Sequence, residues 1–166
     1  INNSYELDNY VALITIGLDA DYWIPPLLLY YNKFKNGGLI EFAHALDKKI
    51  SADFIIGISP SKRIDSANAI LRHIDTALDV KTALTSDVYN INANDLIRVL
   101  AGNSVYGRRY AKYLLLKLDL LLHGHTTRLD MPPTISIEHI LPQTPDGQSQ
   151  WVKDFDEKER EIWTDR

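Results

Sequence analysis

The sequence has no cysteine among its 166 residues, which excludes disulfides, zinc sites built on thiolates and catalysis by a cysteine nucleophile. It also lacks a long apolar run. The longest stretch, residues 114–122, is interrupted by Lys117 and Asp119 and falls far short of the roughly 20 apolar residues of a membrane span. Glu6 and Asp8 lie where a signal peptide would need basic and apolar residues. We therefore expect a cytoplasmic protein with no membrane partner.

The chain has no strong excess of charge of one sign. Lys and Arg number 18 and Asp and Glu 22, giving a net charge of −4, while 45% of the residues are hydrophobic. This balance is ordinary for a globular domain and excludes a disordered tail or a strongly basic nucleic-acid arm. The chain starts at Ile1 and stops at Arg166 within a charged stretch. We therefore expect it to be a fragment of a longer protein.

The first 124 residues show no β-hairpin signal, no glycine-rich phosphate loop and no internal repeat. Apolar residues recur at helical spacing instead. Residues 36–38 (Asn-Gly-Gly) indicate a helix stop, and Ser59-Pro60 indicates the start of a helix whose apolar face includes Ile64 and Leu78. Residues 80–91 give only weak signals. The pattern predicts a mainly α fold, an irregular bundle (residues 1–124) of about six helices, over residues 5–18, 24–35, 39–56, 59–78, 96–100 and 106–122.

The composition changes after residue 124. Residues 125–133 contain two prolines and are interpreted as a linker. Residues 134–140 alternate β-branched and polar side chains, which is typical of a strand. Pro142 requires this strand to end by residue 140 or 141. A turn-rich loop and a charged helix over residues 151–163 complete the prediction.

One segment carries residues suited to chemistry. Glutamate is a hard oxygen ligand for Mg²⁺ or Mn²⁺, and histidine can accept a proton from water near neutral pH. Glu138 and His139 could converge on one bound ion or water at the end of a strand. The other interpretation from the residues alone is structural: Glu138 is then a solvated charge and His139 a hydrogen-bonded loop residue.

The string ISIEHILPQ (residues 135–143) resembles the start of the C-terminal nuclease domain of the GmrSD-type restriction proteins, a domain of the HNH or His-Me finger class. The opening motif has an acid or histidine, a histidine, a hydrophobic residue, any residue and a proline, and Gln143 extends it to the EHxxPQ form. The resemblance implies that His139 is the general base and Glu138 a ligand of one divalent metal, Mg²⁺ or Mn²⁺. Pro142 and Gln143 support the motif. It also implies a bacterial endonuclease that acts on modified phage DNA.

The sequence departs from the family after this motif. A GNLTLL-like strand and a helix with the last metal ligand are missing, as is the DGQQR-like motif expected near the N-terminus. The resemblance therefore implies a truncated ββα unit at residues 134–166, whose partners are the missing N- and C-terminal parts of the same chain. We expect this fragment alone to bind no metal and to cut no DNA. The alternative is a non-enzymatic helical module for interaction or effector sensing; the oligomeric state stays open.

Arg108, Arg109 and Lys112 form a basic cluster at the first turn of the predicted helix 106–122. Cations at a helix N-terminus oppose the helix dipole, so another partner is needed to explain them. A DNA phosphate backbone is one such partner. The alternative is ion pairing with Asp95 or Asp119.

Overall fold

Helices make up the regular structure in the described part of the chain. The computed structural model describes residues 5–18, 20–102, 105–129 and 135–164. The helices in these ranges are α1 (Glu6–Gly17), α2 (Ile24–Phe34), α3 (Leu39–Ile55), α4 (Pro60–Thr76), α5 (Val80–Leu84), the 3-10 helix η1 (Asp87–Tyr89), α6 (Ala93–Leu100), α7 (Ala111–His123), α8 (Gln150–Asp154) and α9 (Glu157–Trp163).

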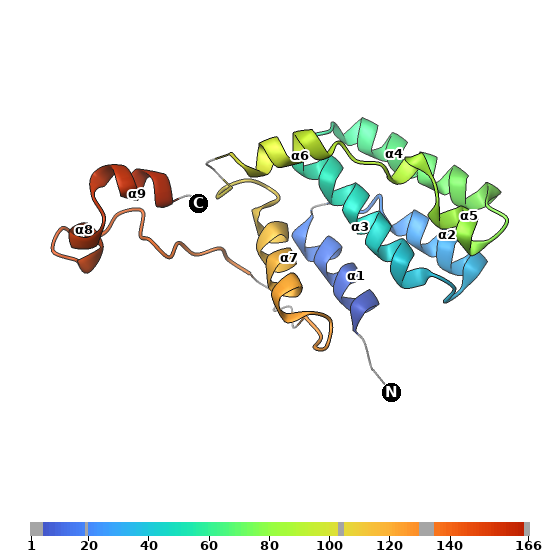
Figure 1. Cartoon of the computed structure of the whole chain (residues 1–166), viewed down its shortest axis with the longest axis horizontal. Coiled ribbons are helices and arrows are strands. Elements are labelled where there is room, and N and C mark those ends of the chain that lie inside the picture. Colours follow the sequence, from blue (N-terminus) through green and yellow to red (C-terminus); the bar gives the residue numbers. More distant parts are fainter. Residues whose placement is uncertain (1–4, 19, 103–104, 130–134, 165–166) are drawn as a thin grey trace.

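Helix α3 lies at the centre of the bundle. It packs against α1 and α2, while α7 covers α1 and α4 covers α2 (Figure 1). The rings of Tyr30 and Phe42 stack with centroids 4.1 Å apart, and both side chains are fully buried together with Leu13 and Ile70. Each such side chain contributes about 1.5–3 kcal/mol by leaving water. The prediction of a mainly α bundle is confirmed.

The predicted helix boundaries on either side of residues 36–38 agree with the structure to within one residue. The residue that ends α2 is Lys35, with a positive φ of 53°, and not one of the two glycines. Gly38 (φ +62°) is instead the N-cap of α3, where an added Cβ would lie 2.7 Å from Val80 Cγ1. The glycine is required there by the close approach of the Val80 side chain, at the start of α5.

Other corrections concern the apolar face of α4 and the segment after it. Ile64 is 48% exposed and Leu78 93% exposed, so neither belongs to the core. The weak stretch 80–91 forms two short helices, because the side chains of Asp79 and Ser86 accept hydrogen bonds from the backbone N–H groups of residues 82 and 88.

The C-terminal region differs most from the prediction. Residues 135–140 form no strand, and residue 134 lies outside the described residues. A single strand needs a partner for its backbone N–H and C=O groups, and the described residues offer none, so the expected ββα unit has no sheet here. The predicted helix 151–163 is two helices. Asp156 divides it by capping α9, with its side chain accepting from the backbone N–H of Glu159 while the Glu159 side chain accepts from that of Asp156.

Part of the predicted linker is tied to the bundle. The buried Asn9 side chain donates to the Thr127 carbonyl at 2.9 Å and accepts from the Leu129 N–H at 2.8 Å. The His125 carbonyl accepts from the backbone N–H of Tyr5 at 3.1 Å. Residues 130–133 lie outside the described residues, and the domain boundaries at 124 and 134 stay predictions.

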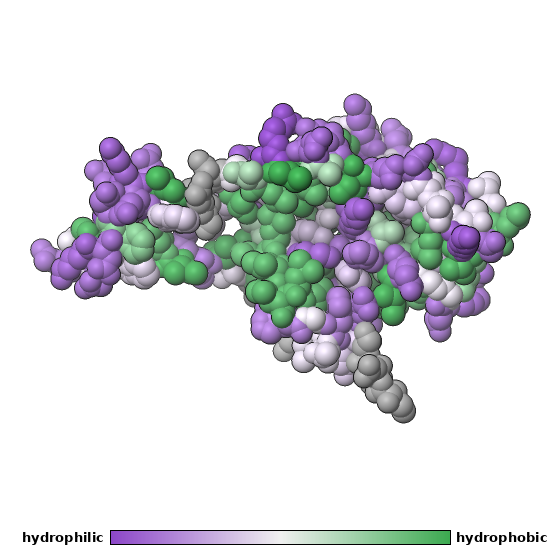
Figure 2. Space-filling view, viewed as in Figure 1, coloured by the Kyte–Doolittle hydropathy of each residue, from purple (hydrophilic) through white to green (hydrophobic). Residues whose placement is uncertain are grey.

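Figure 2 shows an apolar patch over α7. Its exposed members are Leu115, Leu118, Leu121 and Leu122, each at least half accessible to solvent. Within the described ranges, no helix is long and apolar enough to cross a membrane.

Candidate functional site

The Glu138-His139 segment lies between the bundle and the two C-terminal helices, beside a cavity of about 390 Å³. Its walls come from the turn 105–110 and α7 on one side and from α8 and α9 on the other. The lining is largely aromatic and aliphatic, and includes Tyr106, Ala111, Leu115, Trp151, Phe155 and Trp163 together with residues 137–141.

His139 is half-buried at the edge of this cavity. Its imidazole centroid lies 3.7 Å from the ring centroid of Tyr106, with the two planes 49° apart. Tyr106 thus limits the orientations open to the imidazole. The structure places the predicted base in contact with a cavity, which is the position that a group acting on a bound molecule requires.

Glu138 is exposed and accepts a hydrogen bond from Ser136 Oγ at 3.0 Å. No group of three or more His, Asp or Glu side chains in the described ranges lies close enough to hold a metal ion. A divalent magnesium or manganese site draws several oxygen ligands together, and Glu138 offers one carboxylate. The described residues therefore do not fit a complete metal site, and the role of Glu138 stays a prediction.

The rest of the motif anchors the segment. Leu141 is 6% exposed and lines the cavity. Pro142 beside it is half-buried, whereas Gln143 is exposed. Leu141, at the unrestricted position of the motif, is therefore the residue that packs, whereas Ile140 at the hydrophobic position is 89% exposed and Glu138 and Gln143 are also exposed.

The predicted basic cluster is divided by the structure. Helix α7 begins at Ala111, so Arg108 and Arg109 lie in the preceding turn, which Gly107 forms with a φ of +76°. The unfavourable interaction of a cation with the helix dipole therefore applies to Lys112 and not to the two arginines. Arg108 and Arg109 line a second cleft, of about 760 Å³, and Lys112 is not among its lining residues.

The two acids predicted as alternative partners contact other side chains. Asp95 pairs with Arg98 at 2.6 Å, and Asp119 pairs with His123 at 3.0 Å.

Sequence reasoning missed one member of the second cleft, Arg63. It lies on the buried face of α4 with Ala67 and Ile70, at spacings of four and seven residues. A cation at a position of a predicted apolar helix face is the signal that could have identified Arg63, because a buried charge needs a partner that compensates it.

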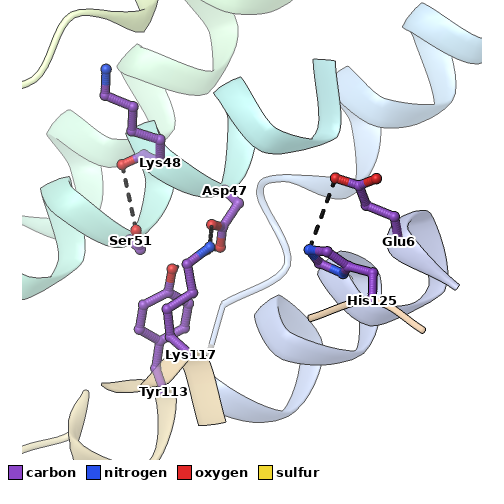
Figure 3. A network of polar contacts seen from close by, with 7 residues as sticks. All are labelled: Glu6, Asp47, Lys48, Ser51, Tyr113, Lys117 and His125. Carbon is purple, nitrogen blue, oxygen red and sulfur yellow. Dashed lines mark hydrogen bonds and ion pairs between the residues drawn. The ribbon is translucent and has the colours of Figure 1, made fainter. Parts of the chain in front are cut away.

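A buried polar network joins α3 to α7 (Figure 3). The Tyr113 hydroxyl donates to Asp47 Oδ1 at 2.8 Å, and Lys117 Nζ donates to Asp47 Oδ2 at 2.7 Å. Asp47 is 1% exposed. Burial, together with the nearby Asp47 charge, raises the pKa of Tyr113 far above its ordinary value. Asp47, Tyr113 and Lys117 find hydrogen-bond partners in one another inside the bundle, so we interpret this network as structural.

Residues 91–166 match the model of one protein family, described as the C-terminal domain of GmrSD restriction endonucleases. The match covers α6, α7 and the whole Glu138-His139 segment. No curated protein and no solved structure is significantly similar to the chain.

Proposed function

We propose, from the membership of residues 91–166 in the family of GmrSD restriction endonuclease C-terminal domains, that this protein takes part in the restriction of DNA. The observation that carries the proposal is the position of His139. The family match covers it, and the structure places it at the edge of a cavity bounded by the bundle and the C-terminal helices. Cytoplasmic action against modified phage DNA is part of the same proposal.

In the proposed reaction, His139 accepts a proton from the water that attacks a phosphodiester. Histidine is the side chain that most often serves as a general base near neutral pH. The ring of Tyr106 limits the orientations open to the imidazole. Proton transfer of this kind contributes about 10²- to 10⁴-fold to a rate.

Metal dependence belongs to the proposal as well. Glu138 would supply one carboxylate ligand to Mg²⁺ or Mn²⁺, which stabilises charge on a phosphate. The other ligands must come from outside the described residues, since no group of three lies within them. We further propose that residues 135–140 become a strand when a second strand is available to pair with them.

The test is plasmid nicking by the longest protein that the gene encodes, with Mg²⁺ or Mn²⁺ added. His139→Ala should abolish nicking, while His123→Ala, an exposed histidine at the end of α7, should leave it unchanged. Nicking that persists in His139→Ala would contradict the proposal. The chain of 166 residues alone should not nick DNA, and robust cleavage by it that needs His139 would refute this expectation.

A second candidate function is a non-enzymatic interaction module. The exposed leucines of α7 favour it, because contiguous apolar surface marks a site of association. Reading the gene beyond the codon for Arg166 separates the two. A strand of the GNLTLL type followed by a helix with Asn or His favours the nuclease, and its absence favours the module.

A further inference from the structure

The cleft that holds Arg108 and Arg109 carries a concentration of positive charge. It lies where the end of α3, the start of α4, the end of α6 and the turn 105–110 meet. Among the described residues that line it, four are arginines and none is acidic: Arg63, Arg98, Arg108 and Arg109. Arg98 pairs with Asp95, and Arg63 is the one of these four arginines that is buried.

Arg63 is the most unusual of these residues. It is 9% exposed, and its Nε has no hydrogen-bond partner. Its Nη1 donates to the Tyr22 hydroxyl at 3.2 Å, and its guanidinium carbon lies 4.5 Å from the Phe54 ring centroid. No carboxylate among the described residues forms an ion pair with it; the buried Asp53 pairs with Lys49 at 3.1 Å. A buried cation without a counter-charge is costly, which points to an anion that belongs in the cleft.

Two further features suit an anion. Helix α4 is 17 residues long, and no side chain caps its N-terminus, so its free N–H groups and dipole favour negative charge there. The ring of Phe54 also orients two of the guanidinium groups. The guanidinium carbons of Arg63 and Arg109 lie 4.5 Å and 5.8 Å from its ring centroid. Guanidinium groups held in this way match the tetrahedral oxygens of a phosphate better than flexible lysines do.

The cleft and the His139 cavity share a wall. Val105, Tyr106 and Ala111 line the cavity, whereas Arg108, Arg109 and Tyr110 line the cleft. The short turn before α7 therefore separates the two spaces. A nucleic-acid strand that crosses this turn would place one phosphate in the cleft and another beside His139.

We propose that this cleft, built from Arg63, Arg108, Arg109 and the N-terminus of α4, is a phosphate site that binds a backbone phosphate of the same DNA strand that passes His139. This inference rests on the proposed function for its ligand, and on the cleft alone for its phosphate chemistry. It assigns Arg63 and the start of α4, outside the family match, to substrate positioning.

The experiment measures binding of a short DNA duplex to the 166-residue chain over a range of salt concentrations. Arg109→Gln should weaken binding about 10-fold at low salt and reduce the salt slope by about 1, as expected for the loss of one phosphate contact. Arg72→Gln removes the same charge from the exposed surface of α4, and should change the affinity less than about 2-fold. Equal losses in the two variants would overturn the proposal, because they would show a diffuse charge effect.

Arg63→Lys keeps the buried charge but removes Nε and the planar fork. It should weaken binding while leaving the salt slope near the wild-type value, and circular dichroism should show the wild-type helix content. Wild-type affinity in both Arg63→Lys and Arg109→Gln would overturn the proposal.

Inorganic phosphate distinguishes the source of the anion. In an amide NMR titration, phosphate should shift the signals of residues 57–63, and the DNA duplex should shift the same signals and compete with it. Phosphate binding that DNA does not displace would refute the assignment to a DNA strand.

The cleft and the proposed function fail separately. If cleavage needs His139 but Arg109→Gln binds DNA with unaltered affinity, only the cleft inference is contradicted. If Arg109→Gln binds DNA more weakly but His139→Ala still nicks DNA at the wild-type level, only the nuclease proposal is contradicted.

Discussion

The bundle (residues 5–129) and the C-terminal segment (residues 135–164) are packed very differently. The bundle buries a continuous apolar core around α3 and a polar network at Asp47. Among the described residues of the C-terminal segment, only Leu141 is buried, while Ile140 is 89% exposed and Trp163 52% exposed. Figure 1 shows this segment extending away from the bundle.

The contrast bears on function, because the family motif lies in the weakly packed segment. Few buried apolar contacts give a region low local stability. The geometry at Glu138 and His139 therefore depends on surfaces that pack against the segment, whereas the arginine cleft is built on the stable bundle. The proposed phosphate site and the proposed catalytic segment therefore lie in regions of unequal stability.

The sharpest comparison removes one aromatic ring from each region. Phe42→Ala should lower the free energy of unfolding by about 3–5 kcal/mol, because it leaves a cavity beside Tyr30 in the core. Phe155→Ala, on a half-buried ring that contacts Trp151, should change the global stability by less than about 1 kcal/mol. Urea denaturation measures both. Equal losses would show that the two regions unfold as one unit.

The polar network should be the next most sensitive feature. Asp47→Ala leaves the Tyr113 hydroxyl and Lys117 ammonium without their shared acceptor, and should cost about 3 kcal/mol. Asp119→Ala removes an exposed pair with His123 and should cost less than about 0.5 kcal/mol. Chemical denaturation of the two variants checks this, and a loss under about 1 kcal/mol in Asp47→Ala would contradict a structural role for the network.

The bundle should also lose stability at alkaline pH. Burial raises the pKa of Tyr10 to about 12, and it raises the pKa values of Tyr22, Tyr30, Tyr89 and Tyr113 as well. The native state therefore keeps these phenols neutral while the unfolded chain ionises near pH 10. Their stabilising effect is complete below pH 10 and is lost as the pH rises from 10 toward 12. Denaturant midpoints across this interval, with absorbance of ionised tyrosine, should show the decline; a constant midpoint would count against it.

The smallest effect should be local to α9. Asp156→Ala removes the capping box with Glu159 and should cost that helix about 1 kcal/mol. Faster amide exchange confined to residues 157–163, with an unchanged urea midpoint for the bundle, is the expected result. A shift of the global midpoint would mean that α9 supports the bundle.

The helical core could be predicted from the sequence because its apolar periodicity is local. Phe42 and Ile70 each lie within an apolar face that repeats at helical spacing along its own helix. Prolines at 25 and 60 start helices where their missing N–H groups cost nothing. The state of residues 135–140 could not be predicted from local sequence alone. Their alternating pattern is real, but a strand depends on a partner that local sequence does not supply.

The candidate site shows the same division. The motif predicted His139 and Glu138, and the structure places His139 at a cavity that periodicity alone does not predict. Arg63 and Arg109 are 46 residues apart in the sequence, yet both line one cleft and both guanidinium groups lie over the ring of Phe54 on α3. Such convergence is a tertiary property, so the cleft was beyond sequence reasoning.

The most direct test of the account is the single-turnover rate of DNA cleavage at saturating protein, measured for the longest encoded protein and its His139→Ala variant, with DNA affinity measured in parallel. We predict that His139→Ala cuts DNA about 10²- to 10⁴-fold more slowly than the wild type, with unchanged affinity for DNA. A variant that cuts DNA at the wild-type rate would contradict it.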